Sequence, residues 1–339
     1  MIGASDPQAS IIAATLDRCF PRVEQSGRAC WTFTLSNGTD LQATALINDS
    51  WLLLGVPLSE PRLVTHELRS WEMLQWNATL PGGAKFAVLA AGLGIHARAE
   101  LPLDDDVNLP SRVVQACAGL NAASAKFRRL GAARSPLPSG GPVLSPVEGG
   151  QDEGVRWIWE EDDTALNTQI VECAPAVELA AVCRESGWAF AERSGKLVVD
   201  LDVPGSFQQA VAQAKTPCGV AVSVDVTTSS EPLAMPCREA LALLLLRTCG
   251  VVRMVRAAVQ NVGSGMAARF EVLFGDTPCG AELSHAFSAL SVACRIAGHE
   301  AVILQHDEII ARAYPKTSLS PLGSACPEPR RRGSGRGPA

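Results

Sequence analysis

Two stretches of this sequence, 171 residues apart, decide the fold. Residues 85–101 read KFAVLAAGLGIHARAEL, and residues 256–272 read RAAVQNVGSGMAARFEV. Seven of the 17 aligned positions are identical without a gap. The identical pairs are Ala87/Ala258, Val88/Val259, Gly92/Gly263, Gly94/Gly265, Ala97/Ala268, Arg98/Arg269 and Glu100/Glu271. A match of this length at one offset predicts that the chain contains two copies of one unit.

Both stretches have the pattern of a hairpin. The glycines supply the positive φ that a tight turn requires, so we predict equivalent turns at Gly92 and Gly263. The spacing G-x-G-x-x-A also fits the dinucleotide-binding fingerprint, which requires a helix directly after the glycines. Residues 95–101 instead alternate like a strand. The sequence therefore predicts two strands at this point and no nucleotide cofactor.

The segments around each hairpin follow one order. We predict an α+β fold of tandem duplicated units, each with a helix, three antiparallel strands, a helix, two strands and a helix. In the first unit the expected elements are a helix at 8–19, strands at 29–35, 41–47 and 51–56, a helix at 61–76, strands at 85–90 and 95–101, and a helix at 109–127. In the second they are a helix at 178–186, strands at 188–192, 196–203 and 219–226, a helix at 236–249, strands at 251–259 and 266–274, a helix at 282–298 and a strand-like extension at 301–313.

Composition sets the domain boundaries. Residues 131–154 are rich in proline and glycine, a density that no helix or central strand tolerates, so they are predicted to be a linker. The first unit is assigned to residues 8–130 and the second to residues 155–315. Residues 316–339 are rich in proline, glycine, serine and arginine and are predicted to be a disordered basic tail.

Charge and cysteine content exclude several classes of protein. The 339 residues carry a net charge of −6, which divides into +4 in residues 316–339 and −10 in residues 1–315. An acidic body repels a phosphate backbone, so nucleic acid is not an expected partner. No apolar run is long enough to span a bilayer and the N-terminus lacks the basic region of a signal peptide, so we expect a cytoplasmic protein without a membrane partner. The eleven cysteines include no C-x-x-C pair, which indicates reduced thiols used as small apolar residues.

No local motif for catalysis or metal binding is present. The five histidines form neither H-x-x-x-H nor H-E-x-x-H, and there is no G-x-S-x-G sequence. The strongest polar cluster is His306-Asp307-Glu308, which we interpret as a solvated strand end or turn. We therefore expect no catalytic residues, no cofactor and no metal. An enzyme whose site is assembled from distant residues remains the alternative.

Two tryptophans stand out directly after the linker. Trp157 and Trp159 share one face of a predicted strand in the sequence Val-Arg-Trp-Ile-Trp. This strand either packs on the sheet of the second unit or forms an exposed edge that pairs with a partner.

Residues 74–103 carry a resemblance to a known family. Leu74-x-x-Asn77-Ala78-x-Leu80-Pro81-Gly82-Gly83-Ala84-Lys85-Phe86-Ala87, followed by Arg98-Ala99-Glu100-Leu101-Pro102-Leu103, resembles the type III secretion chaperone-like family. The YbjN-like sensory-domain proteins share that fold. The first unit matches best, whereas the second matches in element order but lacks Leu-Pro-Gly-Gly.

The resemblance implies a protein that binds proteins without catalysis. Chaperones of this family are typically small, acidic, cytoplasmic homodimers that hold an extended segment of a partner against their sheets. Because this chain carries two units, the resemblance implies either an intramolecular pseudo-dimer or a homodimer. The hypothesis is a tandem chaperone-like protein with Trp51, Leu53, Trp157 and Trp159 as its candidate partner-binding residues. The alternative is a structural or regulatory interaction module without chaperone activity.

Overall fold

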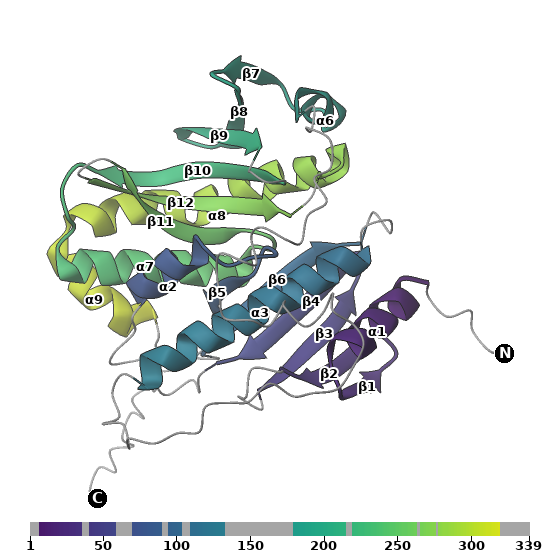
Figure 1. Ribbon diagram of the computed structural model, residues 1–339. Coiled ribbons are helices and arrows are strands. Elements are labelled where there is room, and N and C mark those ends of the chain that lie inside the picture. The colour runs from purple at the N-terminus through teal and green to yellow at the C-terminus, as the bar shows by residue number, and fades with distance from the viewer. Residues whose placement is uncertain are drawn as a thin grey trace, which may run out of the picture.

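Two antiparallel sheets with accompanying helices make up the protein (Figure 1). The computed structural model describes residues 7–35, 41–58, 70–89, 94–103, 109–132, 179–214, 219–262, 265–275 and 277–318. Within them, each unit has one six-stranded sheet. The α+β class and the presence of two similar units are therefore confirmed.

The first unit lies between residues 7 and 132. Its elements are α1 (Pro7–Cys19), β1 (Val23–Gly27), β2 (Cys30–Thr34), β3 (Gln42–Asn48), β4 (Trp51–Pro57), α2 (Ser70–Asn77), β5 (Lys85–Val88), β6 (Ile95–Pro102) and α3 (Leu109–Ala132). The strand order is β1-β2-β3-β4-β6-β5, and all neighbours are antiparallel. In the final hairpin, the second strand, β6, therefore pairs with β4, and the first strand, β5, lies at the edge of the sheet.

The second unit repeats this arrangement. Its elements are α6 (Leu179–Glu185), β7 (Phe190–Arg193), β8 (Lys196–Val203), β9 (Ser206–Ala214), β10 (Val220–Ser229), α7 (Met235–Val251), β11 (Arg256–Val262), β12 (Gly265–Phe274), α8 (Gly280–His306) and α9 (Glu308–Ser318). The strand order β7-β8-β9-β10-β12-β11 is that of the first sheet. The final hairpins differ in register by two residues, because Ala87 pairs with His96 whereas Ala258 pairs with Arg269.

Each unit has four strands before its middle helix, one more than the three predicted. The strands missed are β1 and β9. Strand β1 is a polar edge strand whose residues are nearly all exposed, so it has no alternation of apolar and polar residues to detect. In β9 the inward residues are only Ala210 and Ala212, and the other face carries glutamines. Each strand has few β-branched and aromatic residues, namely Val23 in β1 and Phe207 and Val211 in β9, which was too weak a signal for the prediction.

The strand-like extension predicted at residues 301–313 is wrong. Helix α8 continues to His306, and α9 begins at Glu308. The run Ala-Val-Ile-Leu suggested a strand, but Ala297, Ala301 and Leu304 continue the buried row of α8 at helical spacing. Asp307 sits at the junction, where its Oδ1 accepts the backbone N–H groups of Ile309 and Ile310. It caps the start of α9 rather than ending a strand.

The two glycine-centred hairpins are confirmed as strand pairs. Strands β5 and β6 are antiparallel, as are β11 and β12, so no helix follows the glycines and the dinucleotide fingerprint is excluded at this point. Gly92 and Gly263 themselves lie outside the described residues. Helix α3 runs two residues into the predicted linker, and α9 ends two residues beyond the predicted start of the tail. The rest of the linker and tail lies outside the described residues.

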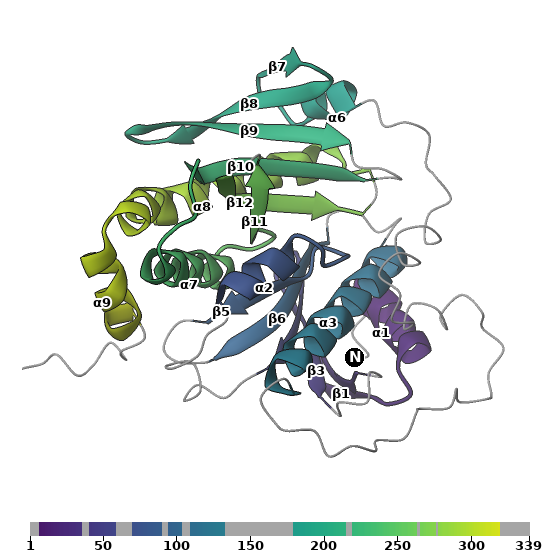
Figure 2. The same cartoon turned by 60° about the vertical axis from the view of Figure 1, so that its left-hand side comes forward.

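Helices cover one face of each sheet. Figures 1 and 2 show α1 and α3 beside the first sheet and α6 and α8 beside the second. Of the described helices, α8 is long and apolar enough to cross a membrane by length and composition. Its residues Leu283, Phe287 and Leu290 are fully buried in the core of the second unit. The opposite side of the helix exposes Val292, Ile296 and Val302, so only one face of α8 belongs to this core.

The buried cysteines give a testable chemical property. The eight cysteines among the described residues are all free. Desolvation by burial raises the pKa of Cys249 to about 11 and that of Cys294 to about 12, from an ordinary value of 9.0. A raised thiol pKa stabilises the fold fully below pH 9, and this contribution is lost as pH rises from 9 towards 11 and 12.

We therefore expect iodoacetamide at pH 8 to leave Cys249 and Cys294 unmodified in the folded protein and to modify both in concentrated urea. Cys30, which is half-buried on β2, is the matched site that should react in the folded state. Mass spectrometry of tryptic peptides measures the modified fraction of each of these three cysteines. Equal modification of Cys30 and Cys249 in the folded protein would contradict the expectation.

Candidate functional site

The two units meet through α2 and α7, which lie between the two sheets (Figures 1 and 2). Helix α2 packs against β11 of the other unit, and α7 packs against β5. The contacts are thus reciprocal, as in a dimer with a two-fold axis. The candidate site is built from the polar side chains buried in this interface.

Lys85, the first residue of β5, extends from the first unit into the second. Its side chain is fully buried, and its Nζ donates to the carbonyl oxygens of Val252 and Val255, both at 2.9 Å. The same Nζ lies 2.9 Å from Glu100 Oε2. The backbone N–H of Met254 donates to that carboxylate at 3.3 Å. Lys85 therefore binds the turn that follows α7, and Glu100 balances its charge.

Arg256, the first residue of β11, makes the reciprocal contact. Its Nη1 donates to the carbonyl oxygen of Leu80 at 2.7 Å, and its Nη2 to that of Ala78 at 3.4 Å. Its Nε lies 2.7 Å from Glu271 Oε1. Lys85 and Arg256 are aligned in the repeat, as are Glu100 and Glu271. Each unit thus inserts a paired cation into the turn after the other unit's middle helix.

Two further side chains extend these contacts. The Asn77 amide donates to the carbonyl oxygen of Ala257 at 2.9 Å, while its Oδ1 accepts the N–H of Phe86 at 2.7 Å. Arg98 donates from Nη1 to the carbonyl oxygen of Gly250 at 2.9 Å. Because buried polar groups are costly unless they are hydrogen-bonded, these partners specify one arrangement of the units.

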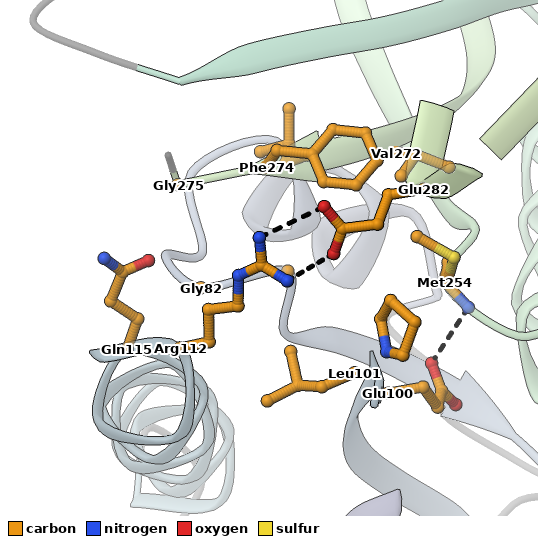
Figure 3. A pocket seen from close by; sticks show the side chains of 13 residues that line it. Gly82, Glu100, Leu101, Arg112, Gln115, Met254, Val272, Phe274, Gly275 and Glu282 are labelled. Atoms are coloured by element: carbon orange, nitrogen blue, oxygen red, sulfur yellow. Dashed lines mark hydrogen bonds and ion pairs between the residues drawn. The ribbon is translucent and has the colours of Figure 1, made fainter. Parts of the chain in front are cut away.

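Arg112 and Glu282 form a two-pronged ion pair at the first turns of α3 and α8 (Figure 3). Arg112 Nη2 donates to Glu282 Oε2 at 3.1 Å, and Nη1 pairs with Oε1. The side chains are only 7% and 1% exposed. Glu282 Oε2 also accepts the backbone N–H of Cys279 at 2.9 Å, which caps α8.

A small cavity adjoins this pair. Its volume is about 40 Å³, and Gly82, Gln115, Met254 and Phe274 are among its lining residues. A volume of this size holds a few water molecules, whereas small-molecule sites typically occupy about 300–1,000 Å³. Among the described residues, the polar groups at this interface therefore join the two units, and this cavity is too small for a substrate of that size.

The face of the first sheet opposite α3 carries two of the predicted partner-binding residues. Trp51 and Leu53 share this face of β4, and both are half-buried. Leu53 is paired across the strands with Leu46, which is 38% exposed. The Trp51 ring lies 5.5 Å from the Arg253 guanidinium and 6.0 Å from the His285 ring, both from the second unit. Trp51 thus borders the interface, and Leu53 lies on the open sheet.

The same face of the second sheet mixes polar side chains with Phe207, which is 77% exposed. Ser223 pairs with Glu271 on β12, just as Leu53 pairs with Glu100 on β6, so Ser223 is the counterpart of Leu53. On its other side Ser223 pairs with Val211 on β9, which is the counterpart of Leu46. A groove of about 360 Å³ crosses this face, lined by Lys196, Phe207, Gln208, Gln209, Val211, Gln213, Ser223, Asp225 and Arg269. Arg269 Nη2 lies 3.0 Å from Asp225 Oδ1, and Gln209 donates to Asp200 at 2.8 Å. These pairs place charged and amide groups around the groove, whereas the position of Leu46 and Leu53 on the first sheet is apolar.

Trp157 and Trp159 lie outside the described residues. Leu46 was missed as a candidate, although its position opposite Leu53 follows once the β3–β4 register is known. Lys85 and Arg256 begin the two aligned stretches as non-identical cations, and the sequence did not predict their role at the interface. Among the described residues, no group of three or more His, Cys, Asp and Glu side chains could hold a metal ion.

Comparison with known proteins adds no relative. No protein-family model, curated protein or solved structure matches the chain. The functional argument therefore rests on the chain's own residues.

Proposed function

We propose that this chain is a non-catalytic, cytoplasmic protein that binds extended protein segments, in the manner of type III secretion chaperones. Its two units would act together as an intramolecular pseudo-dimer. The binding surface would be the open face of the first sheet, around Leu46, Leu53 and Trp51.

The observation that carries this proposal is the Leu46–Leu53 pair. Leucines paired across neighbouring strands on an accessible sheet face offer apolar area to a partner. Soluble proteins usually place polar residues on such a face. At the equivalent pair of positions the second sheet has Val211 and Ser223, and this local difference favours binding at the first sheet.

The reciprocal interface supports the pseudo-dimer. Buried ion pairs and side-chain bonds to backbone carbonyls hold α2 and α7 in one arrangement. A rigid pair of sheets presents a preorganised surface, which lowers the entropy cost of binding an extended segment. The cavity at the interface is too small to favour catalysis there.

A charge placed between the leucines tests the proposal. We expect L46E to weaken binding of reduced, carboxymethylated α-lactalbumin, a permanently unfolded protein, by roughly tenfold or more, because a carboxylate must then be desolvated. Fluorescence anisotropy of the labelled probe gives the Kd. The matched control is V211E, the same substitution at the equivalent position of the second sheet.

V211E should change the Kd by less than about twofold if the second sheet takes no part. Equal losses of affinity for the probe in the two variants would contradict a binding surface on the first sheet. Absence of probe binding to the unaltered protein would contradict chaperone activity and favour an interaction module with one folded partner.

A further inference from the structure

Arg112 and Glu282 occupy equivalent positions in the two units. When α3 and α8 are aligned at an offset of 170 residues, their buried positions coincide. The coinciding pairs are Arg112/Glu282, Val113/Leu283, Ala116/Ala286, Cys117/Phe287, Leu120/Leu290 and Ala123/Ala293. The ion pair in Figure 3 therefore joins one position to its own counterpart across the pseudo-two-fold axis.

This placement has a consequence for self-pairing. In a symmetric pair of two first units, Arg112 would face a second Arg112. In a pair of two second units, Glu282 would face a second Glu282. The position is almost completely buried, so water would not screen either pair of like charges.

The contacts of Lys85 and Arg256 do not discriminate in this way. Lys85 and Arg256 are both cations, each paired with its own unit's glutamate, and each binds carbonyl oxygens of the turn opposite. Backbone carbonyls are available in both units, so these contacts would form in any combination of units. Arg112 and Glu282 differ, because their charges are complementary only when the two units are unlike.

We infer that Arg112 and Glu282 make the first unit pair with the second and prevent either unit from pairing with a copy of itself. This is specificity through a repulsive element in the unwanted complexes. The partner that the interface of the first unit fits is the second unit of this chain, from the same molecule or from another.

The test begins with the full-length chain. A protease site is inserted between Gly140 and Gly141, and the folded protein is then cleaved, so that covalent linkage no longer imposes the pairing. The two fragments differ in mass, and native mass spectrometry after incubation in dilute urea separates the three combinations. The unaltered protein is expected to give only the mixed pair.

Neutral variants separate repulsion from attraction. The R112Q/E282Q double variant removes both charges and keeps amides that can hydrogen-bond, including an acceptor for the cap at Cys279. Relief of repulsion should let self-pairs appear alongside mixed pairs. The single R112E substitution places two carboxylates together in the mixed pair and should weaken it roughly 100-fold.

Two outcomes would overturn the inference. One is self-pairs in comparable amounts from the unaltered cleaved protein. The other is exclusive mixed pairing by R112Q/E282Q, because the determinant would then lie elsewhere in the interface. Circular dichroism of each uncleaved variant establishes that its fold is intact before the pairs are compared.

Discussion

Replacing Lys85 by methionine is expected to lower the free energy of unfolding by about 3–5 kcal/mol. The substitution keeps an unbranched chain of similar length but removes the ammonium group. Glu100 then loses its closest cation in a buried site, and the carbonyl oxygens of Val252 and Val255 lose their donor. Arg98 lies 3.3 Å from the other carboxylate oxygen and compensates only part of the charge. Urea unfolding followed by circular dichroism measures the loss.

The matched control is an ion pair at the surface. Arg312 and Glu308 form an i,i+4 pair on α9 with both side chains more than half exposed, so R312M should change the stability little. Adding E100Q to K85M should recover at least about 1 kcal/mol, because the uncompensated charge is then gone. Equal effects of K85M and R312M would mean that water reaches the Lys85 site and that the buried pair does not join the units.

The sequence was sufficient for the α+β class and for most of the element order, because the repeat and the turns indicate them. The order of helices and strands follows from glycines, prolines and apolar spacing, which act locally. Strands β1 and β9 were not predicted because their strand conformation depends on pairing with neighbouring strands. Strand β1 pairs with β2, and β9 lies between β8 and β10. No pattern in their own residues distinguishes them from loops.

The site was only partly predictable, for a different reason. Trp51 and Leu53 were identified as apolar residues of one strand, and their shared face follows from strand geometry. The residues that join the units were not identified, because Lys85 and Arg256 bind main-chain carbonyls rather than matching side chains. Every residue has a backbone carbonyl, so the sequence does not indicate which of them accepts such a hydrogen bond. Arg112 and Glu282 could be matched only after the burial of both helices was known.

Close approach of the two units depends on a glycine near the end of α7. A Cβ added at Gly250 would lie 2.4 Å from the carbonyl oxygen of Val88, the last residue of β5 in the other unit. Carbon and oxygen do not approach this closely without contact strain, and the neighbour is backbone rather than a flexible side chain. The carbonyl oxygen of Gly250 also accepts the hydrogen bond from Arg98. A shift of α7 to relieve the clash would therefore stretch a second contact between the units.

We expect G250A to destabilise the protein by about 1–3 kcal/mol, even though alanine is the better helix former. Gly298, inside α8, is the matched control, because a Cβ there meets no atom within 4 Å. G298A should stabilise the protein by about 0.5–1 kcal/mol through helix propensity alone. Urea unfolding of the two variants should thus give shifts of opposite sign. Stabilisation by both substitutions would show that α7 and β5 can separate at little cost, and the rigid pseudo-dimer would then be untenable.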